Sequence, residues 1–224
     1  MKYAYVLLAI VTISFISCSP TKTHIKIDFD DLSTVTAMTS SNPSPHPVKL
    51  GDTFKVGDLI TEKISGILIA VLPFQWPPHL PNPPEWTKNG FIEIVKDNKS
   101  GGSGYEIHFD NASLGVVVPN QKKIEKSTLK FADYGGNVNL IENGVMHNED
   151  DFASITSPTS KGLILKIIPG GSTSGTLQLT GTITEFKFPG PISPALESKD
   201  FSYSYVIGGG QELWVDDLNI FIKP

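Results

Sequence analysis

Apolar and polar residues alternate along much of this chain, and this alternation constrains its fold more than any other feature. The period-two stretches are residues 25–30, 129–131, 138–140, 163–167, 177–179 and 201–205. Because successive side chains of a β-strand point to opposite faces of a sheet, this period predicts strands with one buried face. Turn-forming residues separate the stretches, and one turn near 149–152 is the only helical candidate. The pattern predicts an all-β fold, an antiparallel β-sandwich of jelly-roll type.

The predicted sandwich is a single domain at residues 24–224, since a chain of this length is ample for one hydrophobic core. Three polar or proline-rich stretches interrupt the strands, and we interpret them as loop insertions near 36–48, 73–89 and 189–200. The first of them is expected to be exposed and mobile. Between Leu179 and Phe186 the apolar residues shift from odd to even positions, which predicts a bulge or a bend.

Residues 1–17 are interpreted as a lipoprotein signal peptide. Lys2 precedes an apolar run that is too short to span a bilayer, for which a helix needs about twenty residues. The run ends in Phe-Ile-Ser-Cys at 15–18, which resembles the lipobox of bacterial lipoproteins. This resemblance implies cleavage before Cys18, acyl chains on that residue that anchor the protein to a lipid bilayer of the cell envelope, and a tether at 18–23. The alternative is an ordinary buried cysteine or an uncleaved membrane helix.

Composition excludes several classes of function. Cys18 is the only cysteine, so an intrachain disulfide and a cysteine metal cluster are excluded. All eighteen basic residues are lysines, and the formal net charge is −5. Proteins that read nucleic acid rely on arginine and on a basic face, so we expect no nucleic-acid partner.

Three segments carry a resemblance to known domains. They are GGSGYE at 101–106, LKFADYGGNVNL at 129–140 and GGGQELWVDDL at 208–218. Together they resemble a set of secreted bacterial β-sandwich domains of unassigned function, which close with Gly-Gln-Glu-Leu-Trp-Ile-Asp-Asp. More loosely, a first strand at 27–32 beside a last strand at 214–218 is similar to carbohydrate-binding modules of jelly-roll type. That similarity implies that the terminal strands are neighbours and that the ligand is a glycan.

The same similarity implies a structural Ca²⁺ where the terminal strands meet. Calcium takes six to eight oxygen ligands, which carboxylates and backbone carbonyls supply. The alternative is that these aspartates are solvated or cap turns, with Lys26 as a neutralising partner. The candidate ligands are Asp28, Asp30, Asp31, Asp216 and Asp217.

A second candidate site lies in the loop at 73–86, which holds six prolines and two tryptophans. Aromatic faces stack on the apolar faces of sugar rings, and proline reduces the entropy that a loop loses on binding. We therefore predict a polysaccharide-binding surface. Its candidate residues are Trp76, Trp86, Phe74 and Tyr134. The alternative is that the tryptophans pin the loop to the sandwich, whereas Trp214 is expected to be packed within a strand.

Catalysis is not expected. Glu93 and Glu106 could be chosen as a glycosidase pair, but nothing in their context marks them, and the five histidines show no metal-ligand spacing. The predicted function is that of a non-catalytic, glycan-binding lipoprotein of the cell envelope. The alternative is a structural or protein-interaction component, which should expose a flat apolar patch or an unpaired edge strand instead.

Overall fold

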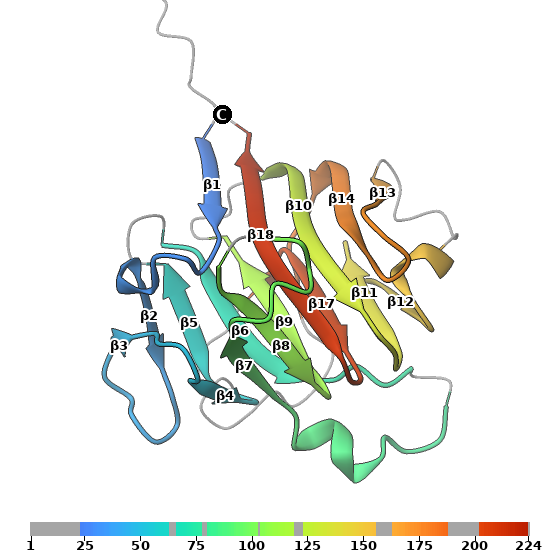
Figure 1. The fold of residues 1–224 in the computed structure, drawn as a ribbon. Helices are drawn as coiled ribbons and strands as arrows, with labels where there is room; N and C mark the ends of the chain where they lie inside the picture. Colours follow the sequence, from blue (N-terminus) through green and yellow to red (C-terminus); the bar gives the residue numbers. More distant parts are fainter. Residues whose placement is uncertain are drawn as a thin grey trace, which may run out of the picture.

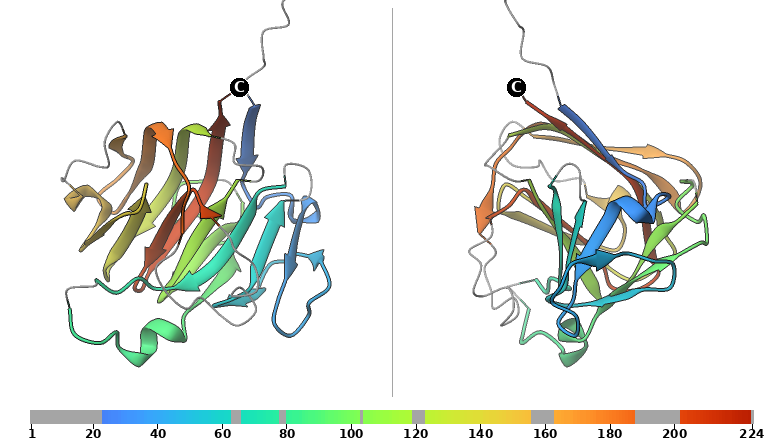
Figure 2. Two further views of the ribbon diagram at one scale, coloured as in Figure 1. Left: turned by 180° about the vertical axis from the view of Figure 1, so that it is seen from behind. Right: turned by 90° about the vertical axis from the view of Figure 1, so that its left-hand side faces the viewer.

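The computed structural model describes residues 23–62, 66–77, 80–102, 104–118, 123–155, 163–187 and 202–223. In this part of the chain, two eight-stranded antiparallel sheets pack against each other (Figures 1 and 2). Sheet A has the order β13 (Ile164–Pro169), β14 (Ser174–Ile183), β10 (Ile124–Asp133), β18 (Leu213–Ile222), β8 (Glu106–Asp110), β7 (Phe91–Val95) and β4 (Thr53–Lys55), and β1 (Thr23–Ile27) also pairs with β18. Sheet B has the order β12 (Val145–Glu149), β11 (Val138–Glu142), β17 (Tyr205–Gly209), β9 (Ala112–Val117), β6 (Leu68–Pro73), β5 (Leu59–Glu62), β2 (Val35–Met38) and β3 (His46–Pro47). A small third sheet pairs β15 (Phe186–Lys187) with β16 (Ser202–Tyr203).

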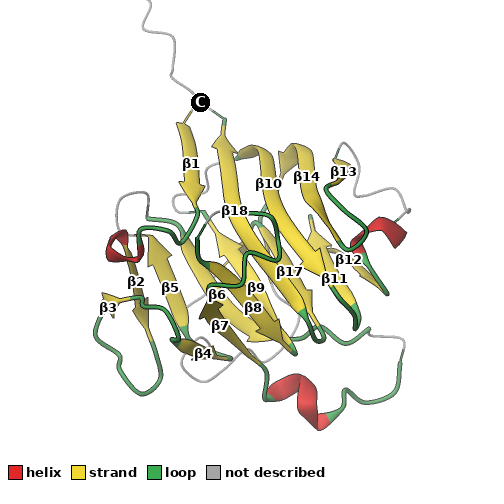
Figure 3. Cartoon of the chain, in the orientation of Figure 1, coloured by secondary structure: helices red, strands yellow, loops and turns green. Residues whose placement is uncertain are grey.

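Helical structure in the described residues is confined to short 3₁₀ turns (Figure 3). These turns are η1 (Leu32–Thr34), η2 (Glu85–Lys88) and η4 (Phe152–Ser154). The last of them confirms the helical turn that the sequence suggested near 149–152, and Asp151 is its N-cap, accepting from Ser154 N–H. None of the described helices has the length and apolar character needed to cross a membrane.

Strand β18 is the central element of sheet A. It pairs with β10 along one side, while β8 and β1 lie end to end along the other, opposite residues 213–215 and 218–222 respectively. Asp216 and Asp217 fall at the junction between these two partners. Asp217 has a positive φ of 49°, and the register with β10 shifts at this point, so the strand carries a bulge.

The main hydrophobic core lies between the two sheets, and its largest fully buried side chains include Phe54, Phe109 and Ile92. A second cluster covers the other face of sheet B, where Leu72 and Tyr203 pack together. Strand β6 contributes to both clusters and is therefore buried on both faces. Its sequence is accordingly a continuous apolar run.

The structure confirms the all-β sandwich, while the finer jelly-roll topology stays a prediction. The predicted loop at 36–48 is wrong at both ends, because residues 36–38 belong to β2 and residues 46–47 form β3, which pairs with it. Ala37 faces the core, and burying it favours strand pairing over an open loop. Residues 1–22, with the predicted signal peptide and Cys18, and the predicted loop at 189–200 lie outside the described residues.

Candidate functional site

Three short turns at one end of the sandwich form the floor of a pocket. Each turn crosses from one sheet to the other: Asn111 joins β8 to β9, residues 134–137 join β10 to β11, and residues 210–212 join β17 to β18. The turns lie side by side because β8, β18 and β10 are neighbours in sheet A, as β9, β17 and β11 are in sheet B. Backbone hydrogen bonds link them, from Asn111 N–H to Gly210 O (3.0 Å) and from Gly210 N–H to Asn137 O (2.7 Å).

The loop between β6 and β7 supplies the aromatic wall of this pocket. Trp86 lies 5.8 Å from both Phe74 and Trp76, measured between ring centroids, and meets Trp76 edge to face at 82°. Phe74 is buried, whereas Trp86 remains 43 % exposed. The three predicted residues therefore do lie together, and the exposed apolar area of Trp86 is available to a ligand.

Both ends of the aromatic loop are fixed to the sandwich. At its start, Asn139 of β11 donates from Nδ2 to Gln75 O (2.8 Å) and accepts from Gln75 N–H (3.4 Å), while Asn148 of β12 also donates to Gln75 O (3.3 Å). At its end, a Cβ on Gly90 would lie 1.8 Å from Asn111 O, so only glycine permits this approach. Sequence reasoning missed Asn139 and Asn148, since nothing local links them to Gln75.

The pocket has a volume of about 560 Å³, which is within the range of small-molecule sites. Its lining combines three aromatic rings with three amide side chains. The lining residues are Phe74, Trp76, Trp86, Asn111, Gly136, Asn137, Gly210 and Gln211. None of these described residues is ionisable, so the pocket offers stacking surfaces and neutral hydrogen-bonding groups but no acid or base.

Tyr134, the fourth predicted ligand residue, does not line this pocket. Its ring meets Trp214 edge to face at 5.5 Å, and Lys99 Nζ lies 5.5 Å from its centroid and 3.5 Å from that of Trp214. His108 stacks on Trp214 at 4.4 Å. Trp214 is thus buried beneath these side chains on sheet A, which confirms that it is packed.

The five predicted calcium ligands do not form one cluster. Asp217 lies between two lysines, with Lys26 Nζ at 2.8 Å and Lys130 Nζ at 2.6 Å. Lys26 also contacts Asp28 at 3.0 Å, and Asp31 caps η1 by accepting from Ser33 N–H. No group of three or more His, Cys, Asp or Glu side chains in the described ranges is placed to hold a metal ion.

The other two predicted ligands, Asp30 and Asp216, lie against the loop between β7 and β8. The loop between β7 and β8 passes over the face of β18 here (Figure 1), so that a Cβ on Gly102 would lie 1.6 Å from Asp216 Oδ2. Asp30 Oδ1 accepts from Tyr105 N–H (3.0 Å) in the same loop. Asp216 is 1 % exposed; this burial, together with the charges of Asp217, Asp30 and Glu106, raises its pKa to about 7.

Glu93 and Glu106, the pair considered for glycoside hydrolysis, differ in their surroundings. Glu106 is buried and accepts hydrogen bonds from Lys99 N–H (2.7 Å) and from the N–H and hydroxyl of Ser100 (2.9 and 2.7 Å). Its carboxylate therefore holds the β7–β8 loop in place. Neither residue lines the aromatic pocket.

Comparison with known proteins found no matching family model, no matching curated protein and no matching solved structure.

Proposed function

We propose that this protein is a non-catalytic, lipid-anchored component of the bacterial cell envelope that binds an uncharged polysaccharide in the aromatic pocket. The observation that carries the proposal is the convergence of Phe74, Trp76 and Trp86 with the amides of Asn111, Asn137 and Gln211 around one pocket. Rings provide stacking surfaces for the apolar faces of sugars, and amides pair with hydroxyl groups as donors and acceptors.

The absence of charge in the described lining supports a neutral sugar. A uronic acid or an amino sugar would bring a charge into a partly desolvated site without a partner, which is unfavourable. Glycoside hydrolysis needs two carboxyl groups beside the scissile bond, and this lining provides neither. These features favour retention of a glycan over its cleavage.

A glycan array probed with the soluble domain, residues 21–224, tests the ligand class. We expect binding to neutral polysaccharides and none to polyuronates. Binding to polyuronates alone would contradict a neutral ligand, and binding to no glycan would contradict the saccharide itself.

Trp86→Ala is expected to weaken glycan binding by about 1–3 kcal/mol, because it removes one exposed aromatic contact. Tyr134→Ala is the matched control, since Tyr134 is similarly exposed (49 %) but lies outside the pocket. Trp76→Ala should also weaken binding, but Trp76 Nε1 donates to Pro81 O (2.9 Å), so that variant additionally loosens the loop. Titration calorimetry and thermal melting separate the two effects. Equal losses in Trp86→Ala and Tyr134→Ala would place the glycan elsewhere.

The anchor is tested separately. Cys18→Ala should abolish incorporation of radiolabelled fatty acid and leave an uncleaved or mislocalised precursor, because that thiol would receive the lipid. In support, β1 begins only five residues after Cys18, at the end of the sandwich opposite the aromatic loop (Figure 1). An anchor at this position would leave the pocket facing away from the bilayer. Labelling that persists in Cys18→Ala would contradict the lipoprotein assignment.

The alternative function, a structural or protein-interaction component, is favoured by one observation. Strand β13 is an edge of sheet A among the described strands, and it exposes Ile164 (65 %) and Ile168 (40 %). An exposed apolar edge strand is a template for pairing with another chain. If Trp86→Ala lowers stability and no glycan is found, this alternative replaces the glycan-binding one.

A further inference from the structure

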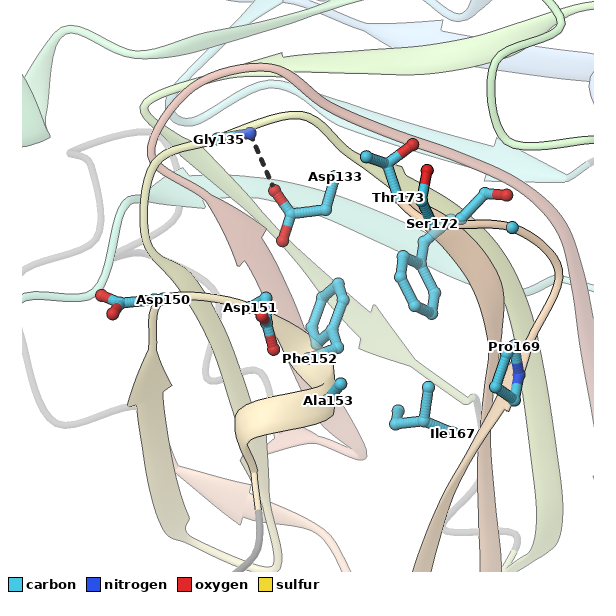
Figure 4. Close-up of a pocket in the computed structure, with 13 residues that line it drawn as sticks. Asp133, Gly135, Asp150, Asp151, Phe152, Ala153, Ile167, Pro169, Ser172 and Thr173 are labelled. Carbon is cyan, nitrogen blue, oxygen red and sulfur yellow. Dashed lines mark hydrogen bonds between the residues drawn. The ribbon is translucent and has the colours of Figure 1, made fainter.

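A second pocket, of about 400 Å³, lies beside the end of β10, and its lining shares no residue with that of the aromatic pocket. Its walls come from β10, η4, β13 and the turn that joins β13 to β14 (Figure 4). Phe131 and Phe152 meet edge to face at 4.9 Å and are buried in the core beneath the pocket, so Ile167 and Pro169 form its accessible apolar side. None of the described lining residues is Lys, Arg or His.

Asp133, the last residue of β10, brings a carboxylate into this pocket. Its Oδ1 accepts from Gly135 N–H (3.2 Å), whereas its Oδ2 is buried and has no hydrogen-bond partner among the described residues. Figure 4 shows the carboxylate directed toward the space beside Phe152 and Asp151. Burial, opposed by the Gly135 hydrogen bond and reinforced by Asp151, raises the pKa of Asp133 to about 6. The carboxylate therefore lies in surroundings that lack a counter-charge.

We infer that this pocket binds an organic ammonium group, with the Asp133 carboxylate turning to accept its N–H and with Ile167 and Pro169 contacting its carbon frame. A buried acceptor without a partner is unfavourable, and a charge-assisted hydrogen bond from an ammonium group would satisfy it. Asp150 and Asp151 add negative charge at the exposed rim.

A metal ion fits the pocket less well than an ammonium group does. Calcium requires six to eight oxygen ligands, but one side of this pocket is hydrocarbon. Asp151 Oδ1 is already engaged, since it accepts from Ser154 N–H (2.6 Å). The lining therefore favours a ligand with one positive group and an apolar body.

The test compares benzylammonium with benzyl alcohol, its neutral analogue of similar shape, by NMR titration of the ¹⁵N-labelled domain at pH 8. Asp133 is ionised at this pH because its pKa lies near 6. We expect benzylammonium to bind at least about tenfold more tightly, which corresponds to about 1.4 kcal/mol. The largest shifts should be at the amides of Gly135 and Phe152.

Asp133→Asn should remove this preference, while Asp150→Asn should retain it. The two variants lose the same charge at the same pocket, but Asp150 lies on the exposed rim. Asn at position 133 can still accept from Gly135 N–H, so the fold is kept, which a thermal melt verifies. Equal affinity for both probes, no binding of benzylammonium, or an unchanged preference in Asp133→Asn would each overturn the inference. Asp133-dependent binding of Ca²⁺ in place of benzylammonium would overturn it as well.

Discussion

A chain that ends at Gly210, without β18, is expected not to fold at all. Strand β18 pairs with β10, β8 and β1, and its side chains Leu213, Val215, Leu218, Ile220 and Ile222 are buried in the core. Each such side chain contributes about 1.5–3 kcal/mol, so their combined loss is comparable with the whole stability of a domain, about 5–15 kcal/mol. Circular dichroism and thermal melting of residues 21–210 would measure the loss.

Two point variants test within the full domain whether folding depends on β18. Ile220→Asp places a charge in the core, whereas Phe221→Asp changes the next residue, which is only partly buried on the opposite face. We expect the first variant to be unfolded and the second to retain a cooperative melt. A soluble, cooperatively melting chain without residues 211–222 would show that β18 is not central.

Asp216→Asn is expected to stabilise the protein at pH 8, by as much as about 4 kcal/mol at 1.36 kcal/mol per pKa unit. The pKa of Asp216 rises from 3.8 to about 7 on folding, so the unfolded chain ionises first as the pH increases. The wild type therefore loses folding stability as Asp216 ionises: this loss is absent below about pH 4, grows between pH 4 and 7, and is complete above pH 7. Asn retains the acceptor for Asp217 N–H (2.6 Å) without the charge. Urea unfolding at pH 4 and pH 8, both with chelator, measures the difference between variant and wild type.

Asp217→Asn is the control, and its expected effect on folding stability at pH 8 has the opposite sign. Burial alone would raise the pKa of Asp217, but hydrogen bonds from Lys130 and Lys26 lower it. Ionisation of Asp217 therefore stabilises the fold above its unfolded pKa, and removing the charge should destabilise the protein at pH 8. If Asp216→Asn also destabilises the protein at pH 8 in chelator, the buried carboxylate has a partner that the structure does not show.

Bound calcium would reverse the stabilisation that we expect for Asp216→Asn in chelator. A bound cation keeps Asp216 ionised, and calcium at 100 times its Kd adds about 2.7 kcal/mol to the stability of the wild type. If the predicted calcium site exists, the melting temperature of the wild type is higher with Ca²⁺ than with chelator, and Asp216→Asn loses that gain. Equal melting under both conditions would leave Asp216 as a buried carboxyl group without a metal.

The strands that sequence could predict are those with one solvated face. β1 and β14 alternate between buried and exposed residues, so their period of two is visible. β6 and β17 are buried on both faces, which removes the alternation. β11 is buried on both faces as well, but its stretch at 138–140 still alternates because the buried Asn139 is polar. The edge pair β2 and β3 was hidden by its prolines and polar residues, although Ala37 and Val48 are buried.

The candidate site was predictable only where its residues are close in sequence. Phe74, Trp76 and Trp86 belong to one proline-rich loop, and they do meet. The amides of Asn111, Asn137 and Gln211 come from three turns whose proximity depends on the strand order of both sheets, which local patterns do not encode. Tyr134 is close to Asn137 in sequence, yet its ring packs on Trp214 instead.

The pairing of β1 with β18 has a mechanical consequence. In the proposed arrangement, a pull on the bound saccharide reaches the lipid anchor through β1, whose first residue, Thr23, lies at the opposite end of the sandwich from the aromatic loop (Figure 1). Hydrogen bonds of an antiparallel pair run perpendicular to the strands, so a force along β1 shears them together instead of opening them one at a time. Five residue pairs, from Thr23 with Ile222 to Ile27 with Leu218, share that force. In the proposed arrangement, this geometry would help the domain to stay folded under tension between a membrane and a polymer.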